Sequence, residues 1–107
     1  MYEIIPAQTF LKAIKALQKK YPSLPDDLEI FAENLQSEPF QGISLGRNCY
    51  KVRFDIKSKR TGKRDNARII TCVKIEHDTI YLLDAYDKSD KSTVKGKELD
   101  VLLSQVP

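Results

Sequence analysis

Between residues 48 and 58 the chain alternates apolar and polar side chains without a break, and this pattern constrains the fold more than any other. Tyr50, Val52, Phe54 and Ile56 fall on one side of an extended chain, and the residues between them fall on the other. The alternation predicts a β-strand with one face on a hydrophobic core and the other face in water. The charged residues on the second face are Lys51, Arg53, Asp55 and Lys57.

The first forty residues follow a helical period instead. Apolar side chains recur three and four residues apart, which predicts one helix over 7–20 and a second helix after Ser23 that Pro39 and Gly42 bring to an end. Ser23 and Asp26 have the spacing of a capping box, so Ser23 is expected to cap the second helix. Together the two segments predict a helical hairpin with one apolar face. That face consists of Phe10, Ile14, Leu17, Leu28, Phe31 and Leu35.

Four further elements complete the expected fold. Strands are predicted over 2–5, 67–76 and 79–86, and a closing helix is predicted over 94–106. The element order is then β-α-α-β-β-β-α. A helical hairpin packed on one face of a mostly antiparallel four-stranded sheet buries both apolar surfaces at once. We therefore expect an α+β fold in a single domain over residues 1–107.

Composition excludes several classes of protein. No apolar run approaches the roughly 20 residues that a membrane helix requires, and the first residues lack the pattern of a signal peptide. We therefore expect a cytoplasmic protein with no membrane partner. Cys49 and Cys72 have no accompanying metal-ligand pattern and are expected to be buried free thiols. His77, the single histidine, is expected to be a turn residue.

The net charge of +3 conceals an uneven distribution. Residues 47–74 contain ten basic and two acidic residues, a net of +8, whereas residues 1–46 and 75–107 carry nets of −2 and −3. A merely solvated surface usually mixes the two signs. A basic block between acidic flanks indicates a polyanionic partner, and the counterions that it would release favour a nucleic acid.

No familiar catalytic constellation is evident in the sequence. There is no Ser/His/Asp or Cys/His set, no glycine-rich phosphate loop and no metal-ligand cluster, so no cofactor is expected. Lysine and arginine can nevertheless suffice for cutting RNA, because the 2′-hydroxyl of the RNA attacks the adjacent phosphate. The protein then orients the strand, stabilises the added negative charge and assists two proton transfers.

Three sequence segments resemble the RelE/ParE superfamily of bacterial toxins. They are CYKVRF from Cys49, GKRDNARIIT from Gly62 and IYLLDAYDKSDKS from Ile80. The likeness is greatest to the HigB branch, in which a basic GK-rich hairpin precedes an Arg-Ile-Ile strand. It runs from Cys49 to about Val94. The resemblance implies a RelE-like fold, cleavage of mRNA in the ribosomal A site, and neutralisation by a cognate antitoxin.

The resemblance also implies roles for individual residues. A Lys-x-Lys pair of the family falls on Lys51 and Arg53, and a strand arginine falls on Arg68. A later family arginine falls on Lys88, and the family's catalytic tyrosine falls near Val94, so the sequence departs from the family at both places. The four expected catalytic residues are Lys51, Arg53, Arg68 and Lys88. The expected RNA-binding residues are Lys57, Lys59, Arg60, Lys63, Arg64 and Tyr86.

Two alternatives remain open at the level of sequence. The ParE type on the same fold inhibits DNA gyrase without catalysis, and the missing tyrosine keeps this alternative open. A non-catalytic RNA-binding module, for instance a decayed toxin, would share the basic block. Cleavage of mRNA, inhibition of supercoiling, or neither effect separates the three.

Overall fold

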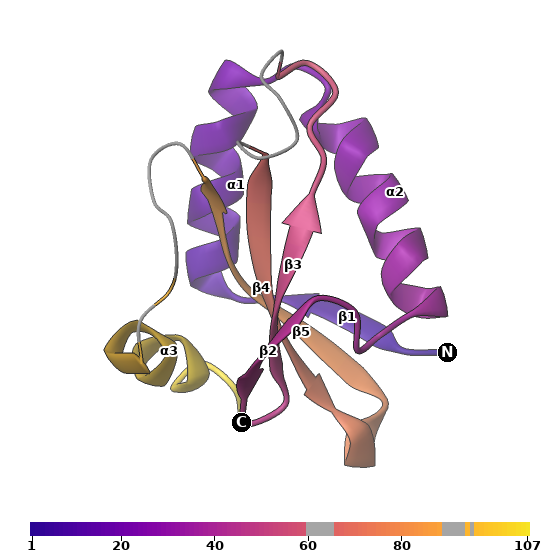
Figure 1. Ribbon diagram of the computed structural model, residues 1–107, viewed down its shortest axis with the longest axis vertical. Coiled ribbons are helices and arrows are strands. Elements are labelled where there is room, and N and C mark those ends of the chain that lie inside the picture. Colours follow the sequence, from indigo (N-terminus) through magenta and orange to yellow (C-terminus); the bar gives the residue numbers. More distant parts are fainter. Residues whose placement is uncertain (60–65, 89–93, 95) are drawn as a thin grey trace.

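A computed structural model shows an α+β fold in which one mixed sheet lies between two layers of helices (Figure 1). The structure describes residues 1–59, 66–88, 94 and 96–107. Within these residues five strands form a sheet in the order β1-β5-β4-β3-β2. β1 runs parallel to β5 and the other neighbours are antiparallel. The elements are β1 (Glu3–Pro6), α1 (Gln8–Lys20), α2 (Leu24–Ser37), β2 (Ile43–Gly46), β3 (Cys49–Phe54), β4 (Ala67–Lys74), β5 (Thr79–Asp87) and α3 (Gly96–Leu103).

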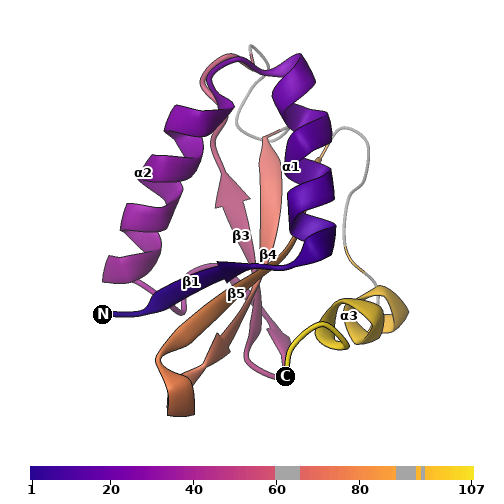
Figure 2. The same cartoon turned by 180° about the vertical axis from the view of Figure 1, so that it is seen from behind.

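The predicted helical hairpin is confirmed and covers one face of the sheet (Figure 2). Phe10 and Leu17 of α1 and Phe31 and Leu35 of α2 are buried, as their helical spacing requires. They pack against β-strand residues that include Phe54, which meets Phe31 edge to face with ring centroids 5.5 Å apart. The core of the protein therefore lies between the hairpin and the sheet.

The start of α2 differs from the predicted capping box. Ser23 occupies the N-cap position, but its side chain makes no capping hydrogen bond to the backbone. Its Oγ instead donates to Oδ2 of Asp27 over 2.6 Å and lies 2.8 Å from Oγ of Ser58. The capping-box prediction was wrong because tertiary partners occupy the Ser23 hydroxyl. Ser23 and Asp27 thus join α2 to the segment that follows β3.

The sheet has one strand more than the sequence predicted. β2 is short and mostly exposed, so it lacks the alternation that identifies a half-buried strand. A two-residue turn at Arg47 and Asn48 joins it to β3, and both residues have positive φ, 54° and 59°. This is the geometry of a type I′ hairpin turn, for which asparagine and glycine are the usual signals. Arginine occupies the first position of this turn instead, so the sequence pattern did not indicate a hairpin there.

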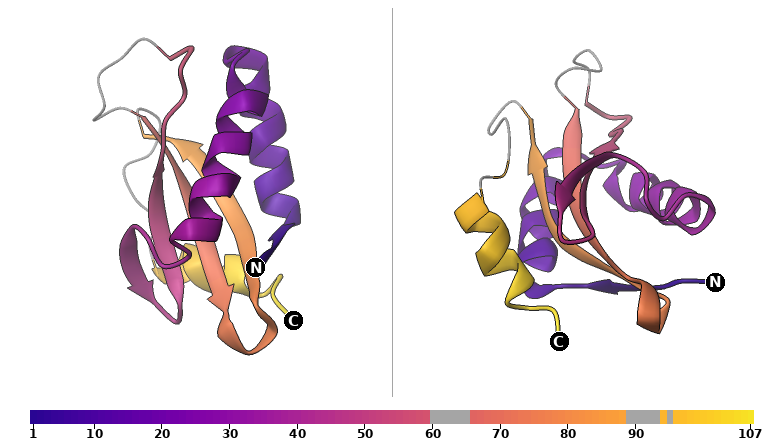
Figure 3. Two further views of the ribbon diagram at one scale, coloured as in Figure 1. Left: turned by 90° about the vertical axis from the view of Figure 1, so that its right-hand side faces the viewer. Right: turned by 60° about the horizontal axis from the view of Figure 1, so that its bottom comes forward.

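The opposite face of the sheet is partly covered by α3 (Figure 3). Leu99 and Leu102 of this helix form a second cluster with side chains of β3, β4 and β5. The expected helix over 94–106 is confirmed in type, but it spans only Gly96–Leu103. The charged side chains of the predicted strand stay at least partly exposed, as expected, and α3 covers other parts of this face. Residues of β4 are consequently buried on both faces, from Ala67 to Val73.

The turn between β4 and β5 is confirmed as a 3₁₀ segment, Ile75–His77, in which His77 is exposed. Both cysteines are buried free thiols, as predicted. Among the described residues, no helix has the length and apolar character needed to cross a bilayer.

Candidate nucleic-acid interface

Two neighbouring strands, β3 and β4, bring basic side chains to the face of the sheet that α3 partly covers, and β5 adds a tyrosine beside them. Arg53 of β3 lies opposite Arg68 of β4, which lies opposite Tyr86 of β5. Lys51 lies one step along the same face of β3, opposite Ile70. Residues that are 15 to 35 positions apart in the chain therefore meet in one row. We refer to Lys51, Arg53 and Arg68 as the basic row.

The basic row lines a groove of about 320 Å³ at the edge of the sheet. The remaining lining residues come from β3 and from the segment that leads into β2: Gln41, Gly42, Ile43 and Val52. The groove is therefore open to solvent on one side and cationic on the other. Its chemistry suits an anion with several oxygens, such as a phosphodiester.

Arg53 and Arg68 form a like-charge pair in direct register. The Val73 N–H donates to the Asn48 carbonyl over 2.9 Å, so pairs counted from there alternate between hydrogen-bonded and non-hydrogen-bonded. By this count Arg53 and Arg68 form a non-hydrogen-bonded pair, in which Cα atoms lie about 4.5 Å apart. Like charges at directly opposite positions destabilise a sheet. An anion bound between them would offset that repulsion.

No carboxylate in the described part of the chain neutralises the basic row. The ion pairs among these residues are Arg47 with Asp100 and Lys59 with Asp87. Within the described residues, the three cations of the row thus have no carboxylate partner at ion-pair distance.

The side chain of Arg68 is held in place by the backbone. Its Nη1 donates to the carbonyl of Asn66 over 3.1 Å and to the carbonyl of Ala67 over 3.0 Å. The residue is only 9% exposed, whereas the sequence predicted a side chain on a solvated surface. That expectation was wrong, because the neighbouring strands enclose the arginine stem. Two fixed hydrogen bonds orient the guanidinium and leave its other donors for a ligand.

Gly42 allows the chain to pass beside β3 and so forms one wall of the groove. It has a φ of +98°, and a Cβ at this position would lie 2.4 Å from the carbonyl oxygen of Lys51. No other residue fits both the conformation and the space. The sequence marked Gly42 only as the end of the second helix. Nothing in the pattern indicated its close approach to Lys51.

Tyr86 completes the row but is mostly buried. It is 7% exposed and belongs to the cluster that α3 covers. Burial raises the pKa of its phenol, and the positive charge of Arg68 opposes this shift only in part. The hydroxyl is therefore protonated at neutral pH. Its expected role in stacking on bases stays a prediction, and so little exposed surface does not favour it.

The other predicted residues lie at different places. The backbone N–H of Lys88 donates to the Asn66 carbonyl over 3.3 Å, which extends the β4–β5 ladder beyond Tyr86. Strand alternation then puts Lys88 on the side of the basic row. The Lys59 ammonium forms a buried ion pair with Asp87, whose other oxygen accepts a 2.7 Å hydrogen bond from Tyr21. Arg60, Lys63 and Arg64 lie outside the described residues.

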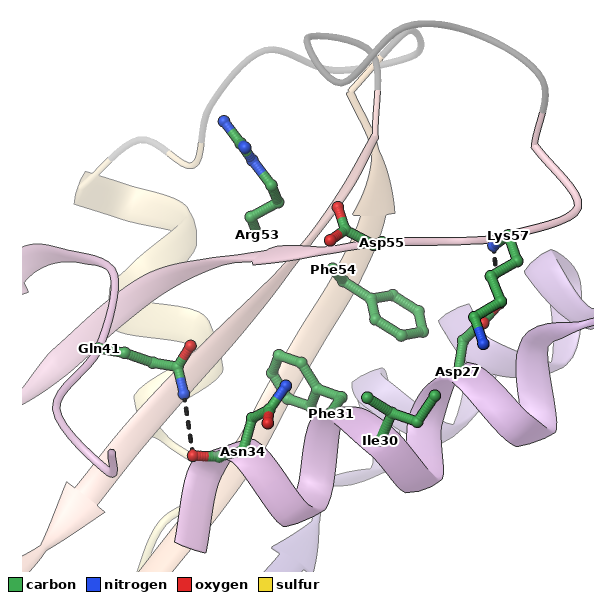
Figure 4. Close-up of a pocket in the computed structure, with 9 residues that line it drawn as sticks. All are labelled: Asp27, Ile30, Phe31, Asn34, Gln41, Arg53, Phe54, Asp55 and Lys57. Atoms are coloured by element: carbon green, nitrogen blue, oxygen red, sulfur yellow. Dashed lines mark hydrogen bonds between the residues drawn. The ribbon is translucent and has the colours of Figure 1, made fainter. Parts of the chain in front are cut away.

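Lys57 lines a second, smaller cavity of about 180 Å³ between α2 and β3 (Figure 4). Figure 4 shows Phe54 and Arg53 on opposite sides of β3, with Phe54 directed toward α2. Oδ2 of Asp27 accepts a hydrogen bond from the Lys57 backbone over 3.1 Å. This cavity contains carboxylates as well as cations, so it lacks the uniform charge of the groove. Arg53 lines this cavity as well as the groove, whereas Lys57 lines the cavity alone.

Comparisons with known proteins identify the fold. No protein-family model matches the sequence, and no curated protein sequence matches it either. Among solved structures, a free-state mutant of the Escherichia coli toxin RelE is similar, with a TM-score of 0.61, 12% sequence identity, and coverage of 99% of this chain and 98% of that chain. The intact E. coli RelBE toxin–antitoxin complex contains a chain with a TM-score of 0.59 and 14% identity, covering 81% of this chain and 96% of that chain. The chain therefore has the RelE fold.

Proposed function

We propose that this protein is a toxin that cleaves mRNA in the ribosomal A site and thereby inhibits translation. The observation that carries the proposal is the like-charge pair of Arg53 and Arg68, in register and beside Lys51. A fold gains nothing in stability from such a pair, so its placement in an open groove points to an anionic ligand. The RelE fold is consistent with this activity.

The proposed reaction uses the RNA as its own nucleophile. The 2′-hydroxyl gives its proton to water and attacks the neighbouring phosphorus, and the bond from phosphorus to the 5′-oxygen of the next nucleotide breaks. Arg68, whose guanidinium the backbone already orients, binds the non-bridging oxygens and stabilises the charge that they gain. Arg53 binds the same phosphate from the adjacent strand. The protein also holds the attacking and leaving oxygens in the geometry that the reaction requires, and this orientation contributes the rest of the rate acceleration.

Lys51 and Lys88 are proposed to complete the site. Lys51 lines the groove and is the proposed proton donor to the leaving 5′-oxygen. Lys88, at the other end of the row, is proposed to hold a flanking phosphate. No metal or cofactor takes part in this scheme. Among the described residues, no three His, Cys, Asp or Glu side chains are grouped as a metal site would require.

An antitoxin is the proposed regulatory partner. One similar structure is a RelBE toxin–antitoxin complex, and an acidic segment of a partner would neutralise the basic row. The proposed location is the cytoplasm, where the ribosomes are. We also propose that the protein belongs to the HigB branch. The sequence likeness over residues 49 to about 94 supports this assignment.

The test is single-turnover cleavage of mRNA on programmed ribosomes, with the RNA ends mapped by primer extension. The wild-type protein is expected to cut, and Arg53→Ala is expected to cut at least 10-fold more slowly, because one phosphate contact is lost. Arg47→Ala is the matched control. Arg47 is also an arginine, but it pairs with Asp100 at the far end of β3.

Three outcomes would contradict the proposal. If supercoiling by gyrase is inhibited while mRNA stays intact, the protein acts as a gyrase inhibitor on the same fold. If neither reaction responds and RNA still binds, the groove belongs to a binding module. A third result, equal loss of cleavage in Arg53→Ala and Arg47→Ala, would show that positive charge in general, rather than the basic row, is responsible.

A further inference from the structure

The two cysteines of the chain face each other across β3 and β4. Cys49 and Cys72 are register partners. The next pair along, Asn48 with Val73, is hydrogen-bonded over 2.9 Å, so the cysteines occupy a non-hydrogen-bonded pair. Cα atoms in such a pair lie about 4.5 Å apart, within the range of about 4.4–6.8 Å that a disulfide spans. A bond between them would require no change of strand register.

The register puts the two buried thiols next to each other in the reduced protein. Their interaction lowers the pKa of the Cys72 thiol and raises that of Cys49. The nearby ammonium of Lys74 also lowers the pKa of Cys72, while burial opposes the shift. The Cys49 thiol has a second acceptor, the Arg47 carbonyl at 3.6 Å. Cys72 is thus the nucleophile of the pair, and Cys49 is the thiol beside it.

We propose that Cys49 and Cys72 are a modification site, at which peroxide produces a reversible disulfide between β3 and β4. The Cys72 thiolate attacks one oxygen of hydrogen peroxide, the O–O bond breaks, and hydroxide leaves. The resulting sulfenic acid is attacked by the sulfur of Cys49, and its oxygen leaves as water. In total two thiols and one peroxide give one disulfide and two waters. Sulfur is oxidised and peroxide is reduced.

The position of the pair in the fold determines both access and consequence. Both sulfurs are buried in the cluster that Leu99 and Leu102 of α3 cover. Cys49 nevertheless follows directly on the exposed turn at Arg47 and Asn48, and α3 is a short helix of 8 residues. Local opening of the turn or of α3 admits a small oxidant.

The bond would close a covalent loop that contains the whole basic row. Arg53 and Arg68 lie between the two cysteines in sequence, on the strands that the bond joins. The cross-link therefore holds the like-charged strands together and reduces the conformational freedom of the unfolded chain. This proposal is independent of the proposed function, because it concerns the thiols alone.

To test the proposal, the reduced, full-length protein is treated with hydrogen peroxide, and the excess peroxide is removed with catalase. The protein is then unfolded and its free thiols are blocked before mass spectrometry. The expected product is a monomer that is lighter by two hydrogen atoms, has no free thiol, and yields a peptide pair joined through Cys49 and Cys72. Dithiothreitol should restore both thiols. The melting temperature of the oxidised protein should rise by about 10 °C.

Cys49→Ala and Cys72→Ala are the matched controls, since each keeps one thiol and can form no internal bond. The proposal is overturned if the treated wild-type protein retains two free thiols, or if it gains oxygen atoms without a cross-link. Disulfide-linked dimers without the internal bond would overturn it as well. So would a cross-linked monomer that melts below the reduced protein, because the strands would then have had to move.

Discussion

The sheet presents two faces that differ in what covers them. Toward α1 and α2, β3 and β4 contribute Val52, Phe54, Ile69 and Val73, all buried and all in one apolar cluster. On the other face, α3 covers only part of the same strands, and the remainder carries the basic row. The first face holds the protein together. The second places like charges side by side, which costs stability and suits a ligand.

One strand serves both purposes because its side chains alternate. Phe54 and Arg53 are adjacent in sequence, yet one is 1% exposed and the other is exposed to solvent. A substitution on the first face should change stability, and a substitution on the second should change ligand binding or cleavage.

The largest effect is expected on the apolar face. Phe54→Ala removes a buried ring that packs against Phe31, and the resulting cavity should cost about 3–5 kcal/mol of unfolding free energy. Chemical denaturation monitored by circular dichroism measures this loss. Val101→Ala, at an apolar position of α3 that is 65% exposed, is the control and should change stability by less than about 0.5 kcal/mol. Equal effects would mean that the hairpin face is not the core.

Arg68 should show the opposite behaviour. Arg68→Lys and Arg68→Ala should both slow mRNA cleavage by about 10²–10³-fold, because lysine lacks the planar fork that binds two phosphate oxygens. The melting temperature of Arg68→Ala should change little, since the lost hydrogen bonds to Asn66 and Ala67 are offset by relief of repulsion from Arg53. Single-turnover kinetics and thermal melting are measured together. A collapsed melting temperature would make Arg68 a structural residue.

Gly42 lets the segment before β2 lie against the backbone of Lys51. Gly42→Ala adds a methyl group 2.4 Å from the Lys51 carbonyl oxygen and should cost about 1–3 kcal/mol. Gly46→Ala is a matched control, since Gly46 also has a positive φ, +84°, but nothing lies within 4 Å of the added atom. The difference between the two variants in denaturation measures the steric contribution. No difference would show that the segment moves freely.

Binding by the basic row should depend on salt. The double variant Lys51→Gln/Arg53→Gln removes two phosphate contacts, so the slope of log affinity against log salt should become shallower by about 0.7 per contact on single-stranded RNA. Filter binding over a range of salt concentrations gives both slopes. Lys12→Gln, on the exposed side of α1, should leave the slope unchanged. An unchanged slope in the double variant would exclude the row from the interface.

The smallest effect is expected where α3 meets the turn before β3. Arg47 and Asp100 form an ion pair 2.7 Å long, but their side chains are 54% and 63% exposed. Asp100→Asn should therefore change the unfolding free energy by no more than about 0.5 kcal/mol. Thermal melting at low and high salt measures this. A larger loss would mean that α3 depends on this pair rather than on Leu99 and Leu102.

The sequence alone determined the elements whose signal is local. The alternation over residues 48–58 placed Val52 and Phe54 on the core, and the helical spacing of Phe10, Leu17 and Phe31 placed the hairpin. These predictions succeeded because the spacing of apolar residues along the chain is enough to indicate which side chains of a helix or strand share its buried face. The α+β class, the mostly antiparallel sheet and the position of Lys51 and Arg53 on one strand followed from the same patterns.

Only the tertiary structure decided which distant residues meet. Whether Arg53 stands opposite Arg68 depends on strand register, and a shift of one residue would have moved Arg68 to the apolar face. The pairing of Lys59 with Asp87, the burial of Tyr86 beneath α3 and the approach of Gly42 to Lys51 likewise join separate segments. Such contacts form when all elements pack around one core. A local pattern specifies which face of an element is apolar, but it contains no information on what lies against that face.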